Sequence, residues 1–448
     1  MTFLSIVTAF LQQVTEIGEF FFTQYDELGR PFLNFLNAGF SHIFDVFLIL
    51  LTVVSFGYLL TTIYVKFRKR EPYKEAPFEG ELPFVTIQIP TRNELAAINC
   101  AQKCLDFDYP KEKYEVLIGD DSSDASVSGE LALFAEKHEN VRVIKREKND
   151  GYKAGNLNNM LAHSKGEFVV LFDSDFLPEA DFLKRIIAPM LHDRGIAAVQ
   201  ARWKFANADQ NLVSLLGATI VAIVHRVALP FFNKRRRLSI LCGSAEAVRK
   251  DVLVKLGGWR HGSLTEDIEY SLRLLKEGHR IQYLPELECA SEVPYTPKDL
   301  YRQQMRWAYG VISSLKEHFK IFLSRKLNLE DKLLVVYVFS GYIFTITMFA
   351  VFLFGALEII THEPEAINFA KFFLETGKNF LWTSGLLVTG IYSLKKAGSN
   401  RKIRQIALAT ARYGIITTYY VNIGILKVLT GKPMPWFLLS KKGNEASK

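Results

Sequence analysis

Four acidic residues stand where two strands of the predicted sheet end. Asp120 and Asp121 directly follow the second predicted strand, and Asp173 and Asp175 directly follow the fourth. Functional groups of parallel sheets gather at the carboxyl ends of strands. Two carboxylates at positions i and i+2 can turn toward one divalent ion, and their oxygen atoms suit Mg²⁺ or Mn²⁺, which complete their shells with phosphate and water. An isolated pair of this kind is more often a solvated turn, so it gains weight only from further motifs.

A second acidic motif, Thr265-Glu266-Asp267, precedes an amphipathic stretch from Ile268 to Leu275. Thr265 predicts a helix N-cap, and acids in the first turn stabilise such a helix by about 1 kcal/mol. An acid at a helix start beside a metal-bound substrate is also well placed to act as the general base for a hydroxyl group. The two interpretations are compatible.

A third group lies on a basic, aromatic helix that leads toward an apolar segment. Gln303, Arg306 and Trp307 are spaced at i, i+3 and i+4, which places them on one helix face. Arginine and glutamine can bind a diphosphate, and an indole can stack on a sugar ring. Taken alone, an arginine and a tryptophan at a membrane interface would be commonplace.

The elements that must position these residues form an α/β domain. Between about residues 80 and 310, short β-branched runs alternate with helical stretches, which is typical of a mostly parallel, Rossmann-like sheet. The predicted strands are Phe84–Ile89, Tyr114–Ile118, Val141–Ile144 and Phe168–Phe172.

Apolar segments flank this domain and indicate a membrane protein. Val46–Val65 and Leu333–Leu357 are uncharged runs long enough to cross a hydrocarbon core of about 30 Å. Asn379–Leu394 is a shorter candidate span. Gln405–Leu426 contains Arg412 in its middle, and a central arginine costs about 2.5–3.5 kcal/mol on insertion scales, so we expect a re-entrant or interfacial helix there.

Basic residues set the expected orientation. A basic cluster follows the first span and places the α/β domain in the cytosol by the positive-inside bias; it consists of Lys66, Arg68, Lys69 and Arg70. Asn211–Phe232 is apolar but, if it spanned, would separate Asp173 from Asp267. We therefore expect it to lie on the bilayer, with Lys234–Arg237 at the headgroups.

The net charge of +8 does not indicate nucleic-acid binding, because the basic residues cluster beside apolar segments. The four cysteines provide neither a disulfide framework nor a metal-ligand pair of the usual spacing, and Cys100 and Cys104 are expected to be buried thiols.

Six motifs in order resemble the family 2 processive glycosyltransferases, which include cellulose, hyaluronan and chitin synthases. The resemblance covers about residues 83 to 325 and implies a GT-A fold. The motifs are IPTRNE (Ile89–Glu94), GDDSSD (Gly119–Asp124), GYKAGNLN (Gly151–Asn158), FDSD (Phe172–Asp175), LTED (Leu264–Asp267) and QQMRW (Gln303–Trp307). Different stretches of the sequence resemble different subfamilies. FDSDFLPEADFLKR and VQARWKFANAD are similar to plant cellulose-synthase-like enzymes that make mannan, glucomannan or xyloglucan backbones, and LCGSAEAVRK is similar to bacterial cellulose synthase.

The resemblance implies a role for each matching position. The catalytic base would be Asp267, positioned by Glu266, and Asp173 and Asp175 would bind Mg²⁺ or Mn²⁺. The donor, a UDP-sugar or GDP-mannose, would be bound by Thr91, Glu94, Asp120, Asp121, Lys153, Gln303 and Arg306. The acceptor would be bound by Trp307, Cys242, Gly243 and Ser244.

The C-terminal region resembles the gating loop of processive synthases, which closes over bound donor. Phe437, Ser440 and Lys442 occupy the positions of its aromatic, hydroxyl and lysine residues. A tryptophan and phenylalanine before a lysine run is equally typical of a membrane-interface anchor. If the loop gates, the tail must be cytosolic.

The expected activity is inverting, processive transfer of a hexose to a β-linked polysaccharide, coupled to translocation across the cell membrane. The alternative is transfer of a single sugar to a membrane lipid, and a silent transporter or nucleotide sensor would have lost a metal or base carboxylate. The expected organisation is an extracytoplasmic or interfacial segment (1–45), a span (46–65), the catalytic domain (80–310), an interfacial helix (311–330), two spans (333–357 and 379–394), an interfacial or re-entrant helix (403–428) and a cytosolic tail (435–448).

Overall fold

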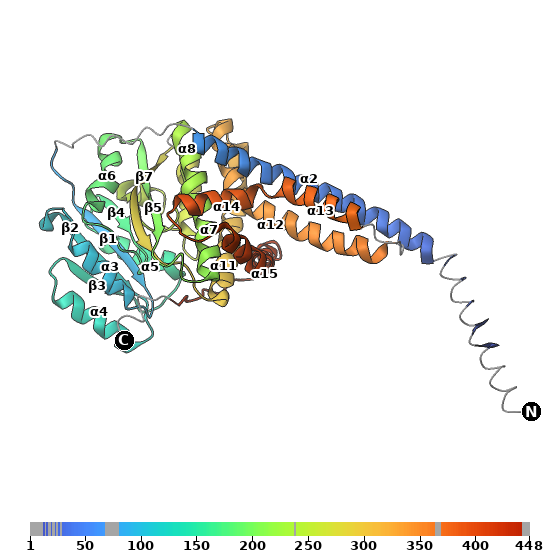
Figure 1. Cartoon of the computed structure of the whole chain (residues 1–448). Helices are drawn as coiled ribbons and strands as arrows, with labels where there is room; N and C mark the ends of the chain where they lie inside the picture. Colours follow the sequence, from blue (N-terminus) through green and yellow to red (C-terminus); the bar gives the residue numbers. More distant parts are fainter. Residues whose placement is uncertain are drawn as a thin grey trace, which may run out of the picture. The chain divides into compact units, whose positions relative to one another are not determined.

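The computed structural model describes residues 30–67, 80–236, 239–362 and 369–440, together with single residues between 12 and 29. The chain divides into two compact units, of which the first contains the chain up to Phe56 together with Ile343–Ser384, and the second contains Gly57–Tyr342 and the chain from Gly385 onward. Figure 1 shows their helices and strands. Several basic groups named above lie outside the described residues: Arg68, Lys69, Arg70, Lys442 and the side chains of Lys234–Arg237.

The second unit is built on a seven-stranded sheet with the strand order β3-β2-β1-β4-β6-β5-β7. β6 runs antiparallel to β4 and β5, and the other neighbouring strands are parallel. The predicted α/β class with a mostly parallel sheet is confirmed, and the four predicted strands form β1 to β4. The strands are β1 (Val85–Thr91), β2 (Tyr114–Asp120), β3 (Val141–Lys145), β4 (Phe168–Leu171), β5 (Ile196–Phe205), β6 (Glu246–Arg249) and β7 (Arg280–Ser291).

Apolar side chains of the strands alternate between two cores. Val116 and Ile118 of β2 pack in one core with α3 and α6, whereas Leu117 packs in the other with α5, α9 and α10. Both faces are covered, which explains why the strands read as continuous apolar runs. The helices are α3 (Ala96–Leu105), α4 (Ala125–Glu136), α5 (Tyr152–His163), α6 (Phe182–His192), α9 (Lys250–Lys255) and α10 (Glu266–Glu277). Because α5 and α10 share one core, residues at their starts can meet.

The apolar stretch after β5 forms α7 (Leu212–Ile223), the π-helical η3 (Val224–Ala228) and α8 (Leu229–Arg236) without a break. By length and composition, the helix over Leu212–Asn233 could cross a membrane, but 72% of its most apolar window is buried within the chain. This burial means that much of its apolar surface faces protein.

We expected a separate helix over residues 311–330. Instead, helix α11 (Pro297–Glu317) passes through residue 311 and is followed by η4 (Phe319–Leu323). Helix α15 (Ile403–Leu429), which matches the helix expected at 403–428, packs closely on α11. A Cβ at Gly424 of α15 would lie 2.5 Å from the carbonyl oxygen of Met305, and the rings of Tyr301 and Tyr420 stack at 5.1 Å. The two helices therefore form one closely packed pair.

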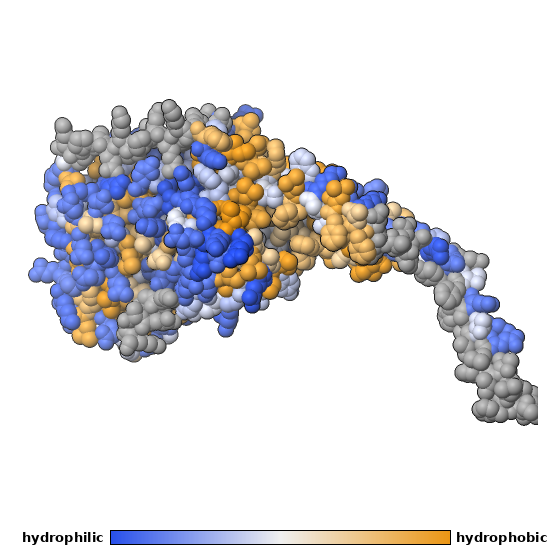
Figure 2. Space-filling model, in the orientation of Figure 1, coloured by the Kyte–Doolittle hydropathy of each residue, from blue (hydrophilic) through white to orange (hydrophobic). Residues whose placement is uncertain are grey.

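Two helices contain the predicted spans 46–65 and 333–357. They are α2 (Arg30–Phe67) and α12 (Leu329–Thr361), and only 17% of the most apolar window of each is buried. Within the first unit, the rings of Phe47 and Phe354 stack at 6.1 Å. Apolar residues gather on these helices in Figure 2. With the helix over Leu212–Asn233, they are the three helices of the described chain that are long and apolar enough to cross a membrane.

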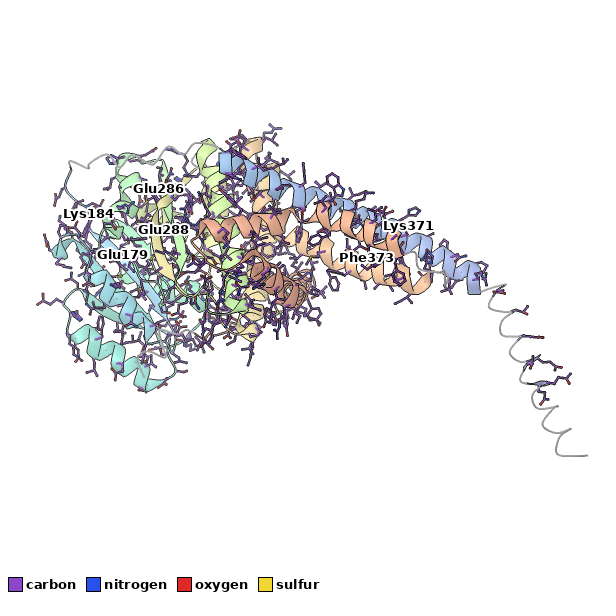
Figure 3. The ribbon with its side chains drawn as sticks, in the orientation of Figure 1. Glu179, Lys184, Glu286, Glu288, Lys371 and Phe373 are labelled. Carbon is purple, nitrogen blue, oxygen red and sulfur yellow. The ribbon has the colours of Figure 1, made fainter. Side chains whose placement is uncertain are left out.

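The helix expected at 379–394 is interrupted. Helix α13 (Phe369–Thr383), which carries Lys371 and Phe373 in Figure 3, ends before Ser384, and α14 (Gly385–Lys396) begins after it. The Ser384 hydroxyl donates a 2.8 Å hydrogen bond to the carbonyl oxygen of Leu381. A serine and a glycine in succession are a usual cause of such a break.

Candidate active site

Lys153, at the start of α5, joins three motifs that are far apart in the sequence. Its Nζ lies 2.8 Å from Asp173 Oδ1 and 3.0 Å from Glu266 Oε1, and it donates a 2.6 Å hydrogen bond to the carbonyl oxygen of Gly243. Burial lowers the pKa of the ammonium group, but the charges of Asp173 and Glu266 outweigh burial and raise this pKa above its ordinary value. Lys153 is therefore a charged link at the centre of the acidic residues.

Asp267 lies in the first turn of α10, and only 9% of it is exposed. Burial and the charge of Glu266 raise its pKa to about 7, against opposing effects of Lys153 and backbone N–H groups. A carboxyl with a pKa near neutrality can both accept and release a proton under physiological conditions. Thr265 occupies the N-cap position as expected, but its side chain forms no cap hydrogen bond, and its Oγ1 lies 3.4 Å from Ser314 Oγ on α11.

Cys242, Gly243 and Ser244 form a loop against these acidic groups. Gly243 has φ = +85°, and a Cβ there would lie 3.2 Å from Asp267 Oδ2. The Ser244 hydroxyl oxygen accepts a 2.8 Å hydrogen bond from the backbone N–H of Asp173. The structure thus brings this loop together with Asp173 and with Asp267.

Asp173 and Asp175 follow β4. Asp175 Oδ2 accepts a 3.1 Å hydrogen bond from the backbone N–H of Glu292, and buried Ser174 donates a hydrogen bond to Glu94. Among the residues that the structure describes, no group of three or more His, Cys, Asp or Glu side chains could hold a metal. Two carboxylates still fit Mg²⁺ or Mn²⁺, which take remaining ligands from phosphate oxygens and water.

The residues expected to bind the nucleoside lie at the ends of β1 and β2. The Thr91 hydroxyl donates a 3.0 Å hydrogen bond to the carbonyl oxygen of Glu94, and the backbone N–H of Asp121 donates one of 3.0 Å to the carbonyl oxygen of Thr91. Arg146 grips the Asp121 carboxylate through two hydrogen bonds of 2.7 and 2.6 Å. We did not predict Arg146, which belongs to no motif.

Asp120 is engaged elsewhere. It is buried, its Oδ1 accepts a 2.8 Å hydrogen bond from the backbone N–H of Ser122, and Oδ2 accepts one from Ser128 on α4. Nearby Asn93, at φ = +54°, joins the loops after β1 and β2 by accepting the N–H groups of Ser123 and Asp124. Asp120 therefore organises the loop, and the structure does not bring its carboxylate to Lys153.

Gln303, Arg306 and Trp307 lie on α11 and are all half-buried. Arg306 faces the acidic residues: burial lowers its pKa, while the negative charges of Glu266 and Asp173 oppose this effect. Such a guanidinium group can attract an anionic leaving group. Arg306 Nη1 also donates a 3.1 Å hydrogen bond to the carbonyl oxygen of Leu264, which places it beside the motif Leu264–Asp267.

The segment after α15 runs beside α11. The guanidinium carbon of Arg306 lies 4.3 Å from the ring centre of Trp436, and that of Arg302 lies 4.9 Å from the ring centre of Phe437. Trp436 also stacks on Tyr152, with ring centres 6.2 Å apart and planes at 20°. The aromatic residue over the expected diphosphate-binding arginine is thus Trp436, next to the predicted Phe437.

The rest of the predicted gating loop is described in part. The backbone N–H of Ser440 lies 3.4 Å from Asp299 Oδ2 in the first turn of α11. Lys442 lies outside the described residues. The segment from Trp436 to Ser440 therefore runs beside α11.

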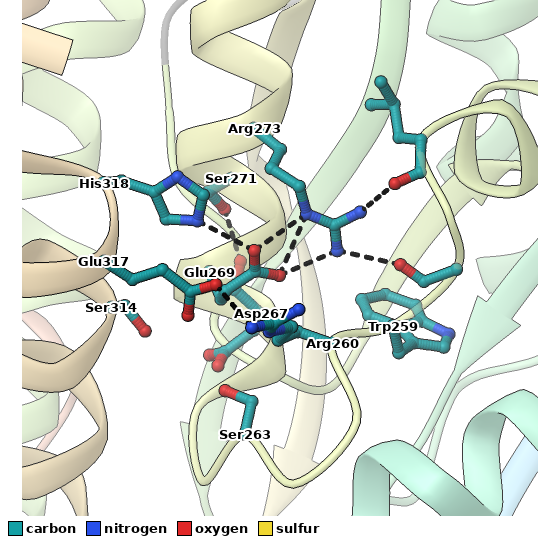
Figure 4. Close-up of polar contacts among 12 residues, drawn as sticks. Trp259, Arg260, Ser263, Asp267, Glu269, Ser271, Arg273, Ser314, Glu317 and His318 are labelled. Carbon is teal, nitrogen blue, oxygen red and sulfur yellow. Dashed lines mark hydrogen bonds and ion pairs between the residues drawn. The ribbon is translucent and has the colours of Figure 1, made fainter. Parts of the chain in front are cut away.

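A buried ion cluster fixes α10 (Figure 4). Glu269 accepts hydrogen bonds of 2.7 to 3.0 Å from Arg273 and lies 2.9 Å from His318 Nε2. Arg273 also donates to the carbonyl oxygens of Leu256 and Gly258. Burial would raise the pKa of Glu269, but hydrogen bonds from His318 and Arg273 outweigh it and lower this pKa. The cluster holds α10, and hence Asp267, against the end of α11.

Comparisons with known proteins identify the family of the α/β domain. The family described as glycosyltransferase like family 2 matches residues 83–310. Glucomannan 4-beta-mannosyltransferase 9 of Arabidopsis thaliana is 31% identical over 283 residues, which are 60% of this chain and 53% of that protein. Glucomannan 4-beta-mannosyltransferase 1 of Oryza sativa subsp. japonica is 28% identical over 380 residues, 81% of this chain and 70% of that protein. The chain spans little more than half the length of several such relatives.

One solved structure has a similar fold. A mannosyltransferase from Pyrobaculum calidifontis, in complex with GDP-Man and Mn²⁺, superposes with a TM-score of 0.63 at 20% identity. The superposition covers 87% of this chain and 100% of that one.

Proposed function

The chain belongs to the glycosyltransferase-like family 2, and we propose that it transfers a hexose from a nucleotide-sugar, with inversion, to a growing β-linked polysaccharide. The observation that carries this proposal is the contact of Lys153 with Asp173, Glu266 and Gly243, because it unites the three sets of residues that donor, base and acceptor would need. The names of the similar plant enzymes and of the GDP-Man complex favour GDP-mannose as the donor.

In this scheme Asp267 is the base. Its carboxylate takes the proton from an acceptor hydroxyl while the hydroxyl oxygen attacks the anomeric carbon of the donor from the face opposite the diphosphate. The bond from that carbon to the diphosphate oxygen breaks, and the α-linked donor gives a β-linked product. Glu266 and Lys153 hold the start of α10 in place, and Gly243 borders the space beside Asp267.

The remaining residues bind substrates. Gln303 and Arg306 hold the diphosphate as it departs, and Trp307 stacks on the acceptor sugar. We expected Lys153 to reach the nucleotide part of the donor, but its ammonium group is directed to Asp173, Glu266 and the carbonyl oxygen of Gly243. Thr91, Glu94 and Asp121 form the nucleoside pocket, in which Arg146 fixes the orientation of Asp121. A divalent ion held by Asp173 and Asp175 would offset the charge of the leaving group.

The acceptor and the membrane arrangement are part of the proposal. We place the catalytic domain in the cytosol and the polymer at the membrane. A lipid acceptor is the second candidate, and one observation favours it: only two of the three helices with membrane-spanning composition in the described chain expose most of their apolar surface, which leaves few helices for a polymer channel.

The test is product analysis with purified full-length enzyme. GDP-mannose, UDP-glucose and UDP-N-acetylglucosamine are supplied separately with Mn²⁺ or Mg²⁺, and products are separated into polymer and lipid fractions and sized by mass spectrometry. We expect a ladder of β-linked mannose with GDP-mannose. A single sugar on lipid would select the second candidate, and no transfer from any donor would refute the proposal.

A further inference from the structure

Glu246 is a buried carboxyl that lies behind the loop Cys242–Ser244. It begins β6, and none of it is exposed. Its Oε2 accepts hydrogen bonds from the backbone N–H groups of Gly243, at 2.9 Å, and Cys242, at 3.2 Å. Its Oε1 is buried without a hydrogen-bond partner in the described part of the chain. A buried polar atom without a partner costs stability, so a function of Glu246 would explain why it is there.

The loop is held from two sides. On the far side, Gln200 Oε1 accepts the N–H of Cys242 at 2.7 Å, and Gln200 Nε2 donates to the carbonyl oxygen of Ser244 at 2.9 Å. On the near side, the carbonyl oxygen of Gly243 accepts from Lys153. The N–H groups of Cys242 and Gly243 therefore point toward Gln200 and Glu246, and the carbonyl oxygen of Gly243 points toward the charged centre of the site.

The side of the loop at Gly243 faces Asp267. The position that a Cβ on Gly243 would take is 3.2 Å from Asp267 Oδ2, and Ser244 binds the backbone N–H of Asp173. A displacement of the loop by less than 1 Å would change the surface beside Asp267 on which an acceptor hydroxyl must rest, and catalytic geometry is sensitive to shifts of about this size.

The charge of Glu246 is suited to this support. Burial and the charge of Asp267 raise the pKa of Glu246, and Lys153 and the N–H of Gly243 oppose that effect only in part. The N–H groups of Gly243 and Cys242 therefore donate to a carboxyl group that burial and the charge of Asp267 both favour in its protonated form.

We infer that Glu246 is a positioning residue for the sugar acceptor: it holds the loop Cys242–Ser244 against Asp267, and this loop presents the acceptor hydroxyl to the base. The inference rests on the proposed function. It adds a residue outside all six sequence motifs, and it assigns the hydroxyl groups of the acceptor sugar as the chemistry that the loop recognises.

The kinetic experiment compares Glu246→Ala, Glu246→Gln and a control, Glu115→Ala. Glu115 is also a buried carboxyl that accepts hydrogen bonds, from Lys165 N–H at 2.7 Å and Thr86 Oγ1 at 2.9 Å, but it lies in β2. With GDP-mannose and β-1,4-linked manno-oligosaccharides, we expect Glu246→Ala to raise the acceptor KM about tenfold or more with the donor KM unchanged. Glu246→Gln keeps an oxygen for the N–H groups and should stay within about threefold of wild type. Glu115→Ala should lower stability without changing the acceptor KM.

A labelling experiment tests the loop independently of transfer. Iodoacetamide modification of Cys242, followed by peptide mass spectrometry on the full chain, should be faster in Glu246→Ala and unchanged in Glu246→Gln and Glu115→Ala. Equal labelling in all variants, or faster labelling with an unchanged acceptor KM, would overturn the inference. If wild type transfers no sugar from any donor, the proposed function fails, whereas labelling still decides whether Glu246 holds the loop.

Discussion

Replacing Asp267 with asparagine should make the protein more stable at neutral and alkaline pH while abolishing sugar transfer. Asp267 is buried, and its pKa is about 7 in the folded chain against an ordinary value of 3.8. A carboxyl with a raised pKa binds its proton more tightly in the folded chain, so folding stability falls as the pH rises from about 4 to 7 and then levels off. The cost at pH 8 is on the order of 4 kcal/mol, and asparagine removes it while preserving the shape.

Glu269 provides a matched control on the same helix. It is also buried, but hydrogen bonds from His318 and Arg273 lower its pKa despite burial. Its contribution to stability is therefore present above its ordinary pKa of 4.5 and lost as the pH falls through the lowered value. Glu269→Gln should destabilise the protein at pH 7 by about 3 kcal/mol, because it leaves Arg273 without its counter-charge.

The assay is the thermal unfolding midpoint of purified full-length protein from pH 4 to 9, together with turnover at each pH. The unfolding midpoint of Asp267→Asn should equal that of wild type at pH 4 and exceed it most by pH 8. The unfolding midpoint of Glu269→Gln should lie below that of wild type at pH 7 and approach it at acid pH. The reasoning is refuted if Asp267→Asn melts below wild type at pH 8, or if its turnover stays within tenfold of wild type.

Three further predictions follow from the same geometry. Excess chelator should abolish transfer and Mn²⁺ or Mg²⁺ should restore it, measured as released nucleoside diphosphate; unchanged activity would remove the metal from the scheme. Trp307→Ala should reduce polymer elongation more than donor hydrolysis, because stacking of the indole on the acceptor sugar contributes about 1 kcal/mol and is absent from hydrolysis. Equal losses in the two reactions would mean that Trp307 only supports the fold. A cysteine at Ser440 should resist an impermeant thiol reagent in intact cells and react in inverted vesicles, and labelling from outside would contradict a cytosolic tail.

The strands and the position of the first acidic pair could be predicted from local patterns. Asp173 follows β4, and functional groups gather at the carboxyl ends of parallel strands. The proximity of Asp267 could not be predicted from topology alone, because β6, the last strand before it, runs antiparallel to β4. Arg146, Glu246 and Trp436 could not be found in this way. Arg146 and Trp436 act on residues that are distant in sequence, Asp121 and Arg306. Glu246 acts on the nearby N–H groups of Cys242 and Gly243, but no spacing pattern marks this contact in the sequence.

The predicted ends of two helices differ from those in the structure. We expected the catalytic domain to end at residue 310, yet α11 continues to Glu317. The expected helix over 379–394 rested on an uncharged run and ignored the ability of Ser384 to bond a preceding carbonyl oxygen. Hydropathy reports burial, whereas local hydrogen bonding decides where a helix ends.

The packing of α15 on α11 bears on the order in which parts of the protein can fold during synthesis. A chain emerging from the ribosome folds its N-terminal parts first, so the sheet with Asp173 and Asp267 can form before α15 has been made. The recognisable family domain ends at residue 310, inside α11, and the ring that covers Arg306 belongs to Trp436, which follows α15. The proposed catalytic groups can thus be assembled early, but α11 gains its packing partner α15 only after the apolar helix α12 has been synthesised. A nascent chain would therefore commit to the membrane before its site is enclosed, and a fragment cut at the family border would resemble that unfinished intermediate more than the mature enzyme.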